Sequence, residues 1–218
     1  MTDRPRRYVL GITGASGAAY ALRFLEQVLL SGAEVHVVAS DNGRRLLADE
    51  AGVRRLDFES LAPSLRDSPR REDYERHLLI HPNRDVGAVI ASGSFLHDGM
   101  AVLPCSSTTL GMIATGAGPF LLSRAAMVCL KERRPLVICH RETPLNLIDI
   151  ENMRRVTLAG AIVCPTNPGF YLLPKTVGEI VDFMVGKVLD LLKIEHRLGT
   201  RWEGQPGASA GAARSSGS

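Results

Sequence analysis

The sequence predicts an α/β fold: a single domain in which a mostly parallel sheet lies between two layers of helices. Short runs of β-branched and apolar residues alternate with longer segments in which apolar residues recur at helical spacing, and this alternation is typical of parallel strands joined by helical crossovers. Most of the short runs are apolar almost throughout, as expected for strands that are covered on both faces. The chain has 218 residues, 45% of them hydrophobic, which is enough for one well-filled core and too little for two.

The expected elements alternate along the chain as far as residue 192. Short apolar runs predict strands, which we place at Tyr8–Ile12, Val35–Ala39, Val86–Ala91, Ala101–Pro104, Leu136–Cys139 and Ala161–Cys164. The longer segments between them predict helices, which we place at Ala18–Leu30, Gly43–Ala51, Thr108–Ala114, Leu121–Lys131, Leu147–Leu158 and Val177–Leu192. The last helix has an amphipathic stripe of apolar residues at positions 177, 180, 181, 184, 185, 188, 189 and 192.

Two segments do not fit the alternation. Residues Pro63–His77 are crowded with charges of both signs, so we expect an exposed excursion there. From Glu203 onward the chain is mostly Gly, Ala and Ser with almost no large apolar side chain, which predicts a disordered tail. We therefore expect one domain over residues 1–202 followed by a tail over residues 203–218.

Composition argues against several classes of protein. The 26 basic and 23 acidic residues give a net charge of +3, too small and too evenly mixed to predict nucleic-acid binding. No stretch reaches 18 apolar residues, so we expect no membrane span. The cysteines at positions 105, 129, 139 and 164 have no paired spacing. We therefore expect neither a zinc knuckle nor a disulfide framework, and a reducing cytoplasm is the simpler location.

The N-terminal region has one feature of an export signal. Arg4, Arg6 and Arg7 precede the run Tyr8–Leu22, which ends in small residues. The interior of that run is Gly-Ile-Thr-Gly-Ala-Ser-Gly, which has the composition of a loop and makes a poor hydrophobic core for a signal peptide. We expect no export.

Ligands of open α/β sheets bind beyond the carboxyl ends of the strands, so the residues that follow each strand are the first candidates. The first strand is followed by the turn Thr13–Gly17, which leads directly into a helix and can offer free N–H groups to an anion. Its spacing is that of neither a dinucleotide-binding loop nor a Walker loop, which argues against NAD and against a nucleotide triphosphatase. A tight turn also needs glycine without any ligand, so both interpretations stay open.

Hydroxyl side chains follow two other strands. Ser40 follows the second strand, where a helix cap and a ligand contact are both possible. The run Cys105–Thr109 stands at another helix start, which predicts either an ordinary N-cap or a second cradle for an anion or a polar ring. No His–Asp pattern accompanies Cys105, so we expect a structural cysteine rather than a nucleophile.

Charged residues complete the candidate site. Arg141 and Glu142 follow another strand, where they would either bind phosphate and move a proton or form a surface ion pair. Arg124 and Lys131 lie seven residues apart on one expected helix, so they face the same way, toward solvent or toward a shared anion. No cluster of Asp, Glu and His suits a metal ion. Together these residues predict a metal-free site for a phosphate-bearing cofactor, with a second anion pocket.

Short strings along the chain form a further pattern. They are Gly11–Gly17, Ser92–Phe95, Pro104–Ser106, Thr109–Leu110, Arg124–Ala126, Leu130–Leu136, Arg141–Leu145, Glu151–Met153 and Pro168–Tyr171. In order and combination these strings, over about residues 7–202, resemble the UbiX-type flavin prenyltransferases. That family was earlier described as aromatic-acid decarboxylases, such as the 3-octaprenyl-4-hydroxybenzoate carboxy-lyase of ubiquinone synthesis.

The resemblance implies a Rossmann-like or flavodoxin-like fold assembled into a homododecamer with sites shared between subunits. It implies that reduced FMN is alkylated at N5 by dimethylallyl phosphate and that a second bond, at C6, closes a fourth ring. The product, prenylated FMN, would serve a UbiD-type decarboxylase as the recipient partner.

The resemblance also implies roles for individual residues. Those that would hold FMN are Gly14, Ala15, Ser16, Ser40, Ser106, Ser107, Thr108, Thr109 and Arg141. Those that would bind the dimethylallyl phosphate are Arg124, Lys131, Arg141, Tyr171 and Lys187, with Arg124 and Lys131 also stabilising phosphate as the leaving group. Ser16, Glu50 and Glu142 would move protons around N5 and C6.

The chain departs from the family pattern at three places. Lys187 stands where an arginine is usual, and it keeps the charge but loses the bidentate fork. Residues Gly118–Phe120 replace a more polar run, and Met127 stands where the family often has aspartate. These changes affect the walls of the site and the subunit contacts rather than the reaction.

Two other functions remain as alternatives. One is an FMN-dependent decarboxylase of the same superfamily that acts on peptidyl-cysteine or phosphopantothenoylcysteine. The other is a non-catalytic flavin carrier or a subunit that activates a decarboxylase by contact. The basic residues Arg124, Lys131, Arg141 and Lys187 fit an isolated phosphate better than a cysteine substrate.

Overall fold

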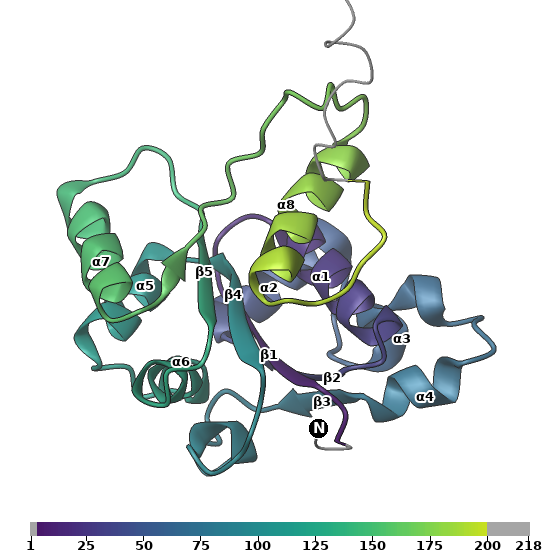
Figure 1. The fold of residues 1–218 in the computed structure, drawn as a ribbon, viewed down its shortest axis with the longest axis horizontal. Helices are drawn as coiled ribbons and strands as arrows, with labels where there is room; N and C mark the ends of the chain where they lie inside the picture. Colours follow the sequence, from purple (N-terminus) through teal and green to yellow (C-terminus); the bar gives the residue numbers. More distant parts are fainter. Residues whose placement is uncertain (1–3, 200–218) are drawn as a thin grey trace, which may run out of the picture.

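The computed structural model describes residues 4–199 and shows a single α/β domain built on one sheet (Figure 1). The sheet has six strands in the order β3-β2-β1-β4-β5-β6. Their bounds are β1 (Arg7–Ile12), β2 (Glu34–Ala39), β3 (Leu78–His81), β4 (Gly99–Cys105), β5 (Leu136–His140) and β6 (Ile162–Val163). Every neighbouring pair is parallel, which confirms the predicted fold class.

Helices cover both faces of this sheet. Their bounds are α1 (Ala18–Leu30), α2 (Asp41–Ala51), α3 (Phe58–Leu61), α4 (Arg71–Arg76), α5 (Ser107–Thr115), α6 (Leu121–Lys131), α7 (Leu147–Leu158) and α8 (Val177–Leu191). Figure 1 shows α5, α6 and α7 on one side of the sheet and α1, α2 and α8 on the other. The predicted three layers are therefore present.

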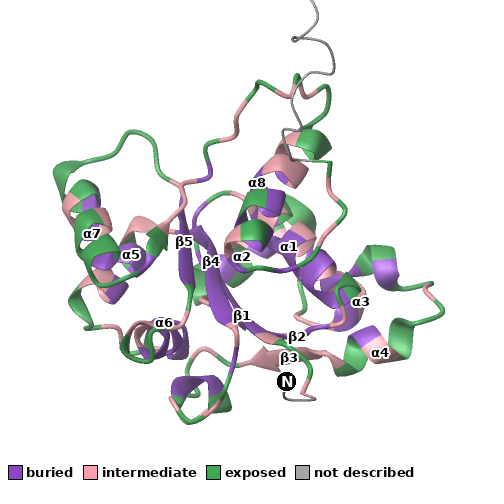
Figure 2. Cartoon of the chain, viewed as in Figure 1, coloured by how far each residue is buried: buried purple, intermediate pink, exposed green. Residues whose placement is uncertain are grey.

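The strands contribute side chains to two cores, one on each face of the sheet. In β1, Tyr8, Leu10 and Ile12 belong to the core that includes residues of α1 and α8. Val9 belongs to the core that includes residues of α5 and α6. Figure 2 shows the central strands β1, β2, β4 and β5 as mostly buried, which explains why they are apolar almost throughout.

The expected strand at Val86–Ala91 is wrong. Residues Val89–Ala91 form a short 3-10 helix instead, and Val86 and Val89 are about half exposed. The third strand is β3, which pairs with β2 at the edge of the sheet. All four of its residues are half-buried, and its apolar run, Leu78–Ile80, is only three residues long, shorter than the runs by which the other strands were found. The remaining predicted strands and helices agree with the structure to within two residues at each end.

The segment Pro63–His77 is less exposed than expected. Leu65 and Tyr74 are buried and join the core on the α1 side, although the charged residues around them face solvent. The expected tail over residues 203–218 lies outside the described residues. Within residues 4–199, no helix is long and apolar enough to cross a membrane.

The order of the strands fixes where a ligand can enter. From β1 the chain moves outward through β2 to β3, and from β4 it moves outward in the opposite direction through β5 to β6. The loops after β1 and β4 therefore diverge from adjacent strands, which opens a crevice at the carboxyl edge of the sheet.

Candidate active site

The two loops that form the crevice are tied together by a buried hydroxyl. Thr13 is fully buried, and its Oγ1 donates to the carbonyl of Pro104 at 2.8 Å and accepts from the N–H of Ser106 at 2.8 Å. Gly14 packs against the first turn of α2, because a Cβ at that position would lie 2.4 Å from the Cβ of Asn42. Glycine is therefore required here by the protein itself, and its presence alone does not indicate a ligand.

Three helices begin around this crevice, each with a capping residue. Ser40 caps α2 by accepting from the N–H of Gly43 at 3.0 Å, and Ser106 caps α5 by accepting from the N–H of Thr109 at 3.3 Å. Asn83, in the loop after β3, accepts from the first two N–H groups of α6 through its carbonyl and its Oδ1, at 2.8 and 3.1 Å. The positive ends of three helix dipoles therefore converge, which favours an anion.

A cavity of about 230 Å³ lies between these helix starts. It is lined by Gly14, Ser40, Asp41, Asn42, Asn83, Ser106, Thr108, Thr109, Met112, Phe120, Leu122 and Ser123. Seven of the twelve lining residues carry a hydroxyl or an amide group, and the carboxylate of Asp41 lies 3.7 Å from the Arg84 guanidinium. The cavity is too small for a whole flavin nucleotide. It fits the phosphate and the polar chain, and the ring system would lie outside it.

The N-terminus of α1 already holds a carboxylate from within the chain. Glu50 Oε2 accepts from the N–H groups of Gly17 and Ala18 at 3.0 and 2.9 Å. Burial raises the pKa of Glu50, but hydrogen bonds from Ser16, Ala18 and Gly17 and the charge of Arg141 outweigh it, so the pKa lies below its ordinary value. A phosphate at this turn would compete with Glu50, so the starts of α2 and α5 are the better phosphate site.

Ser16 and Arg141 lie beside Glu50. The exposed Ser16 offers its carbonyl to Nε of Arg141 at 3.4 Å, and the Arg141 N–H donates to the carbonyl of Cys105 at 3.1 Å. Three of the expected residues, from the ends of β1, α2 and β5, are thus brought together at the carboxyl edge. They form a polar group next to the cavity, on the side where the ring of a bound flavin would lie.

Glu142 is exposed beside this group. Its Oε1 accepts from the N–H of Thr143 at 3.1 Å, and among residues 4–199 it forms no ion pair with Arg141. The surface ion pair that the sequence left open is therefore not formed. The Glu142 carboxylate keeps most of its capacity to accept a proton or a hydrogen bond.

Tyr171 and Lys187 lie on a common flank of α8. The ring of Tyr171 packs edge-on against Phe183, with centroids 5.6 Å apart, and Lys187 follows Phe183 by one helical turn. Lys187 also lies near Cys164, just past β6, where the Cys139 hydrogen bond and the Lys187 charge lower the pKa of the Cys164 thiol to about 7. Lys187 lies in the second half of α8, which ends at the amino edge of the sheet, where the carbonyl of Leu192 accepts from the Tyr8 hydroxyl at 3.4 Å. Among residues 4–199, no contact joins Lys187 to Arg141.

Arg124 and Lys131 are not brought to this group within one chain. Both lie on α6, which runs from the crevice toward the amino end of β5, so seven residues separate them by about 10 Å along the helix. Lys131, in the last turn, pairs with the neighbouring Glu132. The Arg124 side chain is exposed and has no hydrogen-bond or ion-pair partner among residues 4–199. A single chain therefore leaves the expected basic cluster incomplete.

Several residues at the site were missed by the sequence analysis. Asn83 follows β3, so it would have been found if that strand had been recognised. Thr166 follows β6, and its buried Oγ1 has no partner within the described residues. His140 ends β5 with its side chain buried, and its Nε2 lies 3.1 Å from Ser107 Oγ and 4.0 Å from Asp149 Oδ1.

Two kinds of chemistry find no support in the geometry. Cys105 is fully buried, and burial raises the pKa of its thiol far above the ordinary range, so it is a structural cysteine. Among residues 4–199, no three His, Cys, Asp or Glu side chains are grouped so as to hold a metal ion.

Large apolar side chains are exposed near the same edge. On and beside α7 these are Leu145, Leu147, Ile148, Ile150 and Leu158, and in the segment that leads into α8 they are Phe170, Tyr171, Leu173 and Val177. Exposed apolar residues in this number are typical of a surface that another protein covers.

Comparison with known proteins gives consistent results. The model of the Flavoprotein family matches residues 1–189. The chain is 44% identical to the flavin prenyltransferase UbiX of Halalkalibacterium halodurans, over 89% of this chain and 92% of that protein. It is 42% identical to the flavin prenyltransferase UbiX of Thauera aromatica, over 91% of this chain and 94% of that protein.

Solved structures agree with these sequence matches. The crystal structure of AnUbiX (PadA1) in complex with FMN and dimethylallyl pyrophosphate is 37% identical, with a TM-score of 0.81, covering 93% of this chain and 100% of that one. A dodecameric FMN-dependent UbiX-like decarboxylase from Escherichia coli is 36% identical, with a TM-score of 0.79, covering 91% of this chain and 100% of that one. Cysteine decarboxylases such as TvaF, at 13% identity, share the fold alone.

Proposed function

The chain belongs to the flavoprotein family and, within it, to the UbiX-type flavin prenyltransferases, and we propose that it transfers a dimethylallyl group from dimethylallyl phosphate to reduced FMN. The observation that carries this function is the pairing of an anion cavity at two serine-capped helix starts with the polar group of Ser16, Glu50 and Arg141 directly beside it. A phosphate-anchored flavin would reach from the first feature to the second.

FMN fits the cavity by the chemistry of its donors. Ser40 and Ser106 stand at helix starts whose free N–H groups can hold the phosphate, and the hydroxyls of Thr108 and Thr109 can bond the polar chain. Gly14, Ala15 and Ser16 form the wall along which the ring system would lie, with Ser107 and Arg141 behind it. When bound in reduced form, FMN supplies the nucleophilic nitrogen and carbon, N5 and C6, to which the dimethylallyl group becomes attached.

The donor phosphate would lie against Arg141, Tyr171 and Lys187. Both cations would neutralise the negative charge that grows on phosphate as it leaves. Lys187 contributes a point charge without the fork of an arginine, so binding at this position depends less on the orientation of the phosphate. These cations favour a donor whose polar part is a phosphate alone. Such a donor needs positive charge around the phosphate and no contacts to a nucleotide base.

Arg124 and Lys131 would complete the donor site from a neighbouring subunit. Neither reaches Arg141 within one chain, and apolar side chains around α7 and Tyr171 are exposed in a single chain. We therefore propose that subunits pack around this edge and that the assembly is a homododecamer, as in the Escherichia coli relative. Measurement of the particle mass in solution tests the number of subunits.

Proton transfer divides between the two carboxylates. Glu50 accepts hydrogen bonds from Ser16, Gly17 and Ala18, so it orients the Ser16 hydroxyl and can exchange a proton with the flavin only through it. Glu142 has a single backbone donor, so it is the better general base for the proton that C6 must lose.

The product would pass to a partner. We propose that a UbiD-type decarboxylase receives the prenylated FMN and that the reaction takes place in the cytoplasm. The four cysteines are all free thiols, which is consistent with a reducing compartment.

The transfer is tested by mixing the purified protein with reduced FMN and dimethylallyl phosphate without oxygen and measuring the flavin by mass spectrometry. A flavin that has gained the dimethylallyl group supports the transferase. Unchanged flavin together with oxidative decarboxylation of a peptidyl-cysteine would instead identify a cysteine decarboxylase, and flavin binding without either reaction would identify a carrier.

A further inference from the structure

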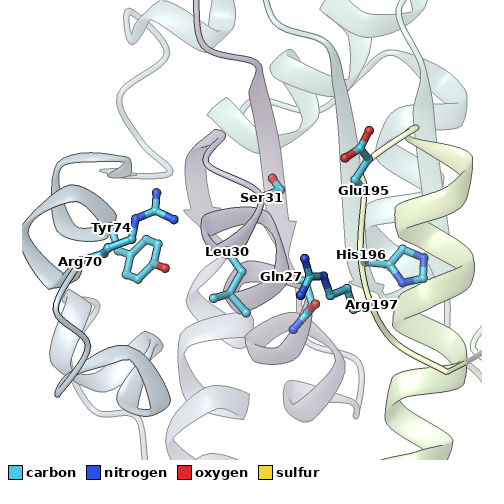
Figure 3. Close-up of a pocket in the computed structure, with 8 residues that line it drawn as sticks. All are labelled: Gln27, Leu30, Ser31, Arg70, Tyr74, Glu195, His196 and Arg197. Atoms are coloured by element: carbon cyan, nitrogen blue, oxygen red, sulfur yellow. The ribbon is translucent and has the colours of Figure 1, made fainter.

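A large hollow lies at the amino edge of the sheet, away from the flavin cavity. It has a volume of about 650 Å³ and is lined by Gln27, Leu30, Ser31, Arg70, Tyr74, Glu195, His196 and Arg197 (Figure 3). These residues come from three segments: the end of α1, the start of α4 and the chain after α8. Because α1 begins at the carboxyl edge and is 13 residues long, about 20 Å separates this hollow from the flavin cavity.

The floor of the hollow is apolar and its sides are basic. Leu30 is 43% exposed at the centre of the hollow, and Figure 3 shows Arg70 and Tyr74 on one side of it and Arg197 and Gln27 on the other. The Arg70 guanidinium lies over the Tyr74 ring, 5.0 Å from its centroid. This stacking holds the guanidinium by one face and leaves its N–H edges open to a ligand.

The two arginines are weakly used within the protein. Among residues 4–199, the Arg70 side chain has one ion-pair contact, from Nε to Asp73 at 4.0 Å, besides its stacking on Tyr74. The Arg197 side chain has no hydrogen-bond or ion-pair partner in the same range. Of the described residues, Glu195 is the one carboxylate that lines the hollow, and Figure 3 shows it directed away from Leu30. Within residues 4–199, two guanidinium groups therefore face a space that contains a single, outward-directed negative charge.

Gln27 gives independent support for a ligand. It is only 7% exposed and lines the hollow, and in the described part of the chain no side-chain hydrogen bond satisfies its carboxamide. Its amide atoms are not among the fully buried side-chain atoms that lack a partner, so they reach the open space of the hollow. The Gln27 carboxamide lies between Leu30 and Arg197. From there its N–H groups can donate hydrogen bonds to an anion in the hollow.

The segment that carries Arg197 is fixed in place. His196 has a fully buried side chain whose Nε2 lies 3.3 Å from Asp190 Oδ1, while its Nδ1 accepts from the N–H of Leu198 at 3.2 Å. These contacts anchor the chain after α8 on both sides of Arg197. The guanidinium is therefore presented by an ordered segment, which reduces the entropy that a ligand must overcome.

From these features we infer that the hollow is a second binding site, for an organic anion that carries a carboxylate or a phosphate ester on an apolar body. Arg70 and Arg197 hold the anionic group with the Gln27 carboxamide, and the apolar body rests on Leu30. The volume lies within the range of about 300–1,000 Å³ that is usual for small-molecule sites. This site goes beyond the proposed function, and the flavin reaction does not need it.

The test uses the full-length protein saturated with FMN and measures binding by calorimetry. The probes are phenyl phosphate and benzoate, with benzylamine as a cation of similar size. We expect one or both anions to bind and benzylamine not to bind. Binding of phenyl phosphate alone or of benzoate alone identifies which anionic group the site takes, and binding of neither anion would overturn the inference.

Variants locate the site. In Arg197→Ala we expect anion affinity to fall by about tenfold, because a charge-assisted hydrogen bond is lost. The control is Arg66→Ala. Arg66 is exposed and lies on the same segment as Arg70, but it does not line the hollow, so this variant should bind the probe as the unmodified protein does. The variant Arg141→Ala shows whether the probe binds instead at the proposed site of the donor phosphate. Anion binding that survives Arg197→Ala, or that is lost in Arg141→Ala instead, would contradict the inference.

Discussion

Glu50, near the end of α2, closes the N-terminus of α1 by accepting the N–H of Gly17 at 3.0 Å. The two residues are 33 positions apart, so the contact depends on α2 crossing the start of α1. It places a carboxylate beside Ser16 and Arg141, where a flavin ring would lie, and it also stabilises the fold. Both consequences can be measured separately.

Glu50→Gln should lower the stability of the fold by about 1 kcal/mol, as for loss of a helix cap. The amide oxygen can still accept one N–H hydrogen bond, but it carries no negative charge to interact with the positive end of the α1 dipole. Because the pKa of Glu50 is lowered in the folded state, its stabilising effect should be complete above the ordinary value of 4.5 and lost as pH falls through the lower, folded value. Urea unfolding of the variant measures the change.

The matched control is Asp49→Asn, on the same helix. Its carboxylate is exposed and, in the described part of the chain, pairs with Arg45 alone, so its loss should change stability by less than about 0.5 kcal/mol. Equal effects of the two variants would show that Glu50 does not cap α1.

Ser106→Ala should weaken FMN binding by about tenfold. The hydroxyl caps α5 at the wall of the cavity, and its loss removes both a hydrogen-bonding group and the fixed position of the first turn. Fluorescence titration of flavin gives the affinity.

Thr176→Ala provides the comparison, because Thr176 caps α8 in the same way, by accepting from Glu179 at 3.2 Å, and does not line the cavity. It should lose similar stability and keep full flavin affinity. If both variants lost affinity equally, the effect would come from stability and not from the cavity.

Glu142→Gln should slow formation of the prenylated flavin by roughly 10² to 10⁴-fold, the usual contribution of a positioned base. The change keeps the shape of the side chain and removes the proton acceptor, so FMN and donor should bind nearly as before. The variant Glu151→Gln, on the exposed side of α7, should react at the normal rate. Loss of flavin binding in Glu142→Gln would instead assign the residue to orientation of Arg141.

Stability should fall in mild acid because two of the buried histidines, His36 and His97, have a strongly lowered pKa. His36 and His97 are 2% and 4% exposed, and burial, together with nearby positive charges, lowers the pKa of each to about 4. The unfolded chain takes up protons near pH 6.5, so stability is complete above that pH and is lost as pH falls from 6.5 toward 4. Each histidine should contribute on the order of 3 kcal/mol at most.

Urea midpoints between pH 7 and pH 4.5 measure this loss. His97→Gln should flatten the dependence, because Gln does not titrate. A midpoint that is unchanged over this range would show that the two imidazoles do not gain protons on unfolding.

The sequence predicts the fold well where the signal is local. Continuous apolar runs identify the central strands, and helical spacing gives the bounds of α1, α6 and α7. The edge strand β3 was missed because its apolar run, Leu78–Ile80, is only three residues long, and Asn83 was missed with it. A short apolar run at Val86–Ala91 was mistaken for that strand.

The site was less predictable because its contacts are non-local. Following each strand to its end finds Ser40, Ser106 and Arg141, since parallel strands bring their carboxyl ends to one edge. Nothing local indicates that Glu50 reaches Gly17. Helical spacing also shows that Arg124 and Lys131 share a face, but the direction in which α6 runs, away from the crevice, becomes visible only in the structure.

The most direct test of prenyl transfer is the release of phosphate from dimethylallyl phosphate, measured against the flavin that is consumed. A flavin prenyltransferase that holds the donor phosphate with basic side chains should release one phosphate per flavin. It should do so with reduced FMN and not with oxidised FMN, and equally in the presence of EDTA. Release of phosphate without flavin would identify a hydrolase, and no release with reduced FMN would contradict the account.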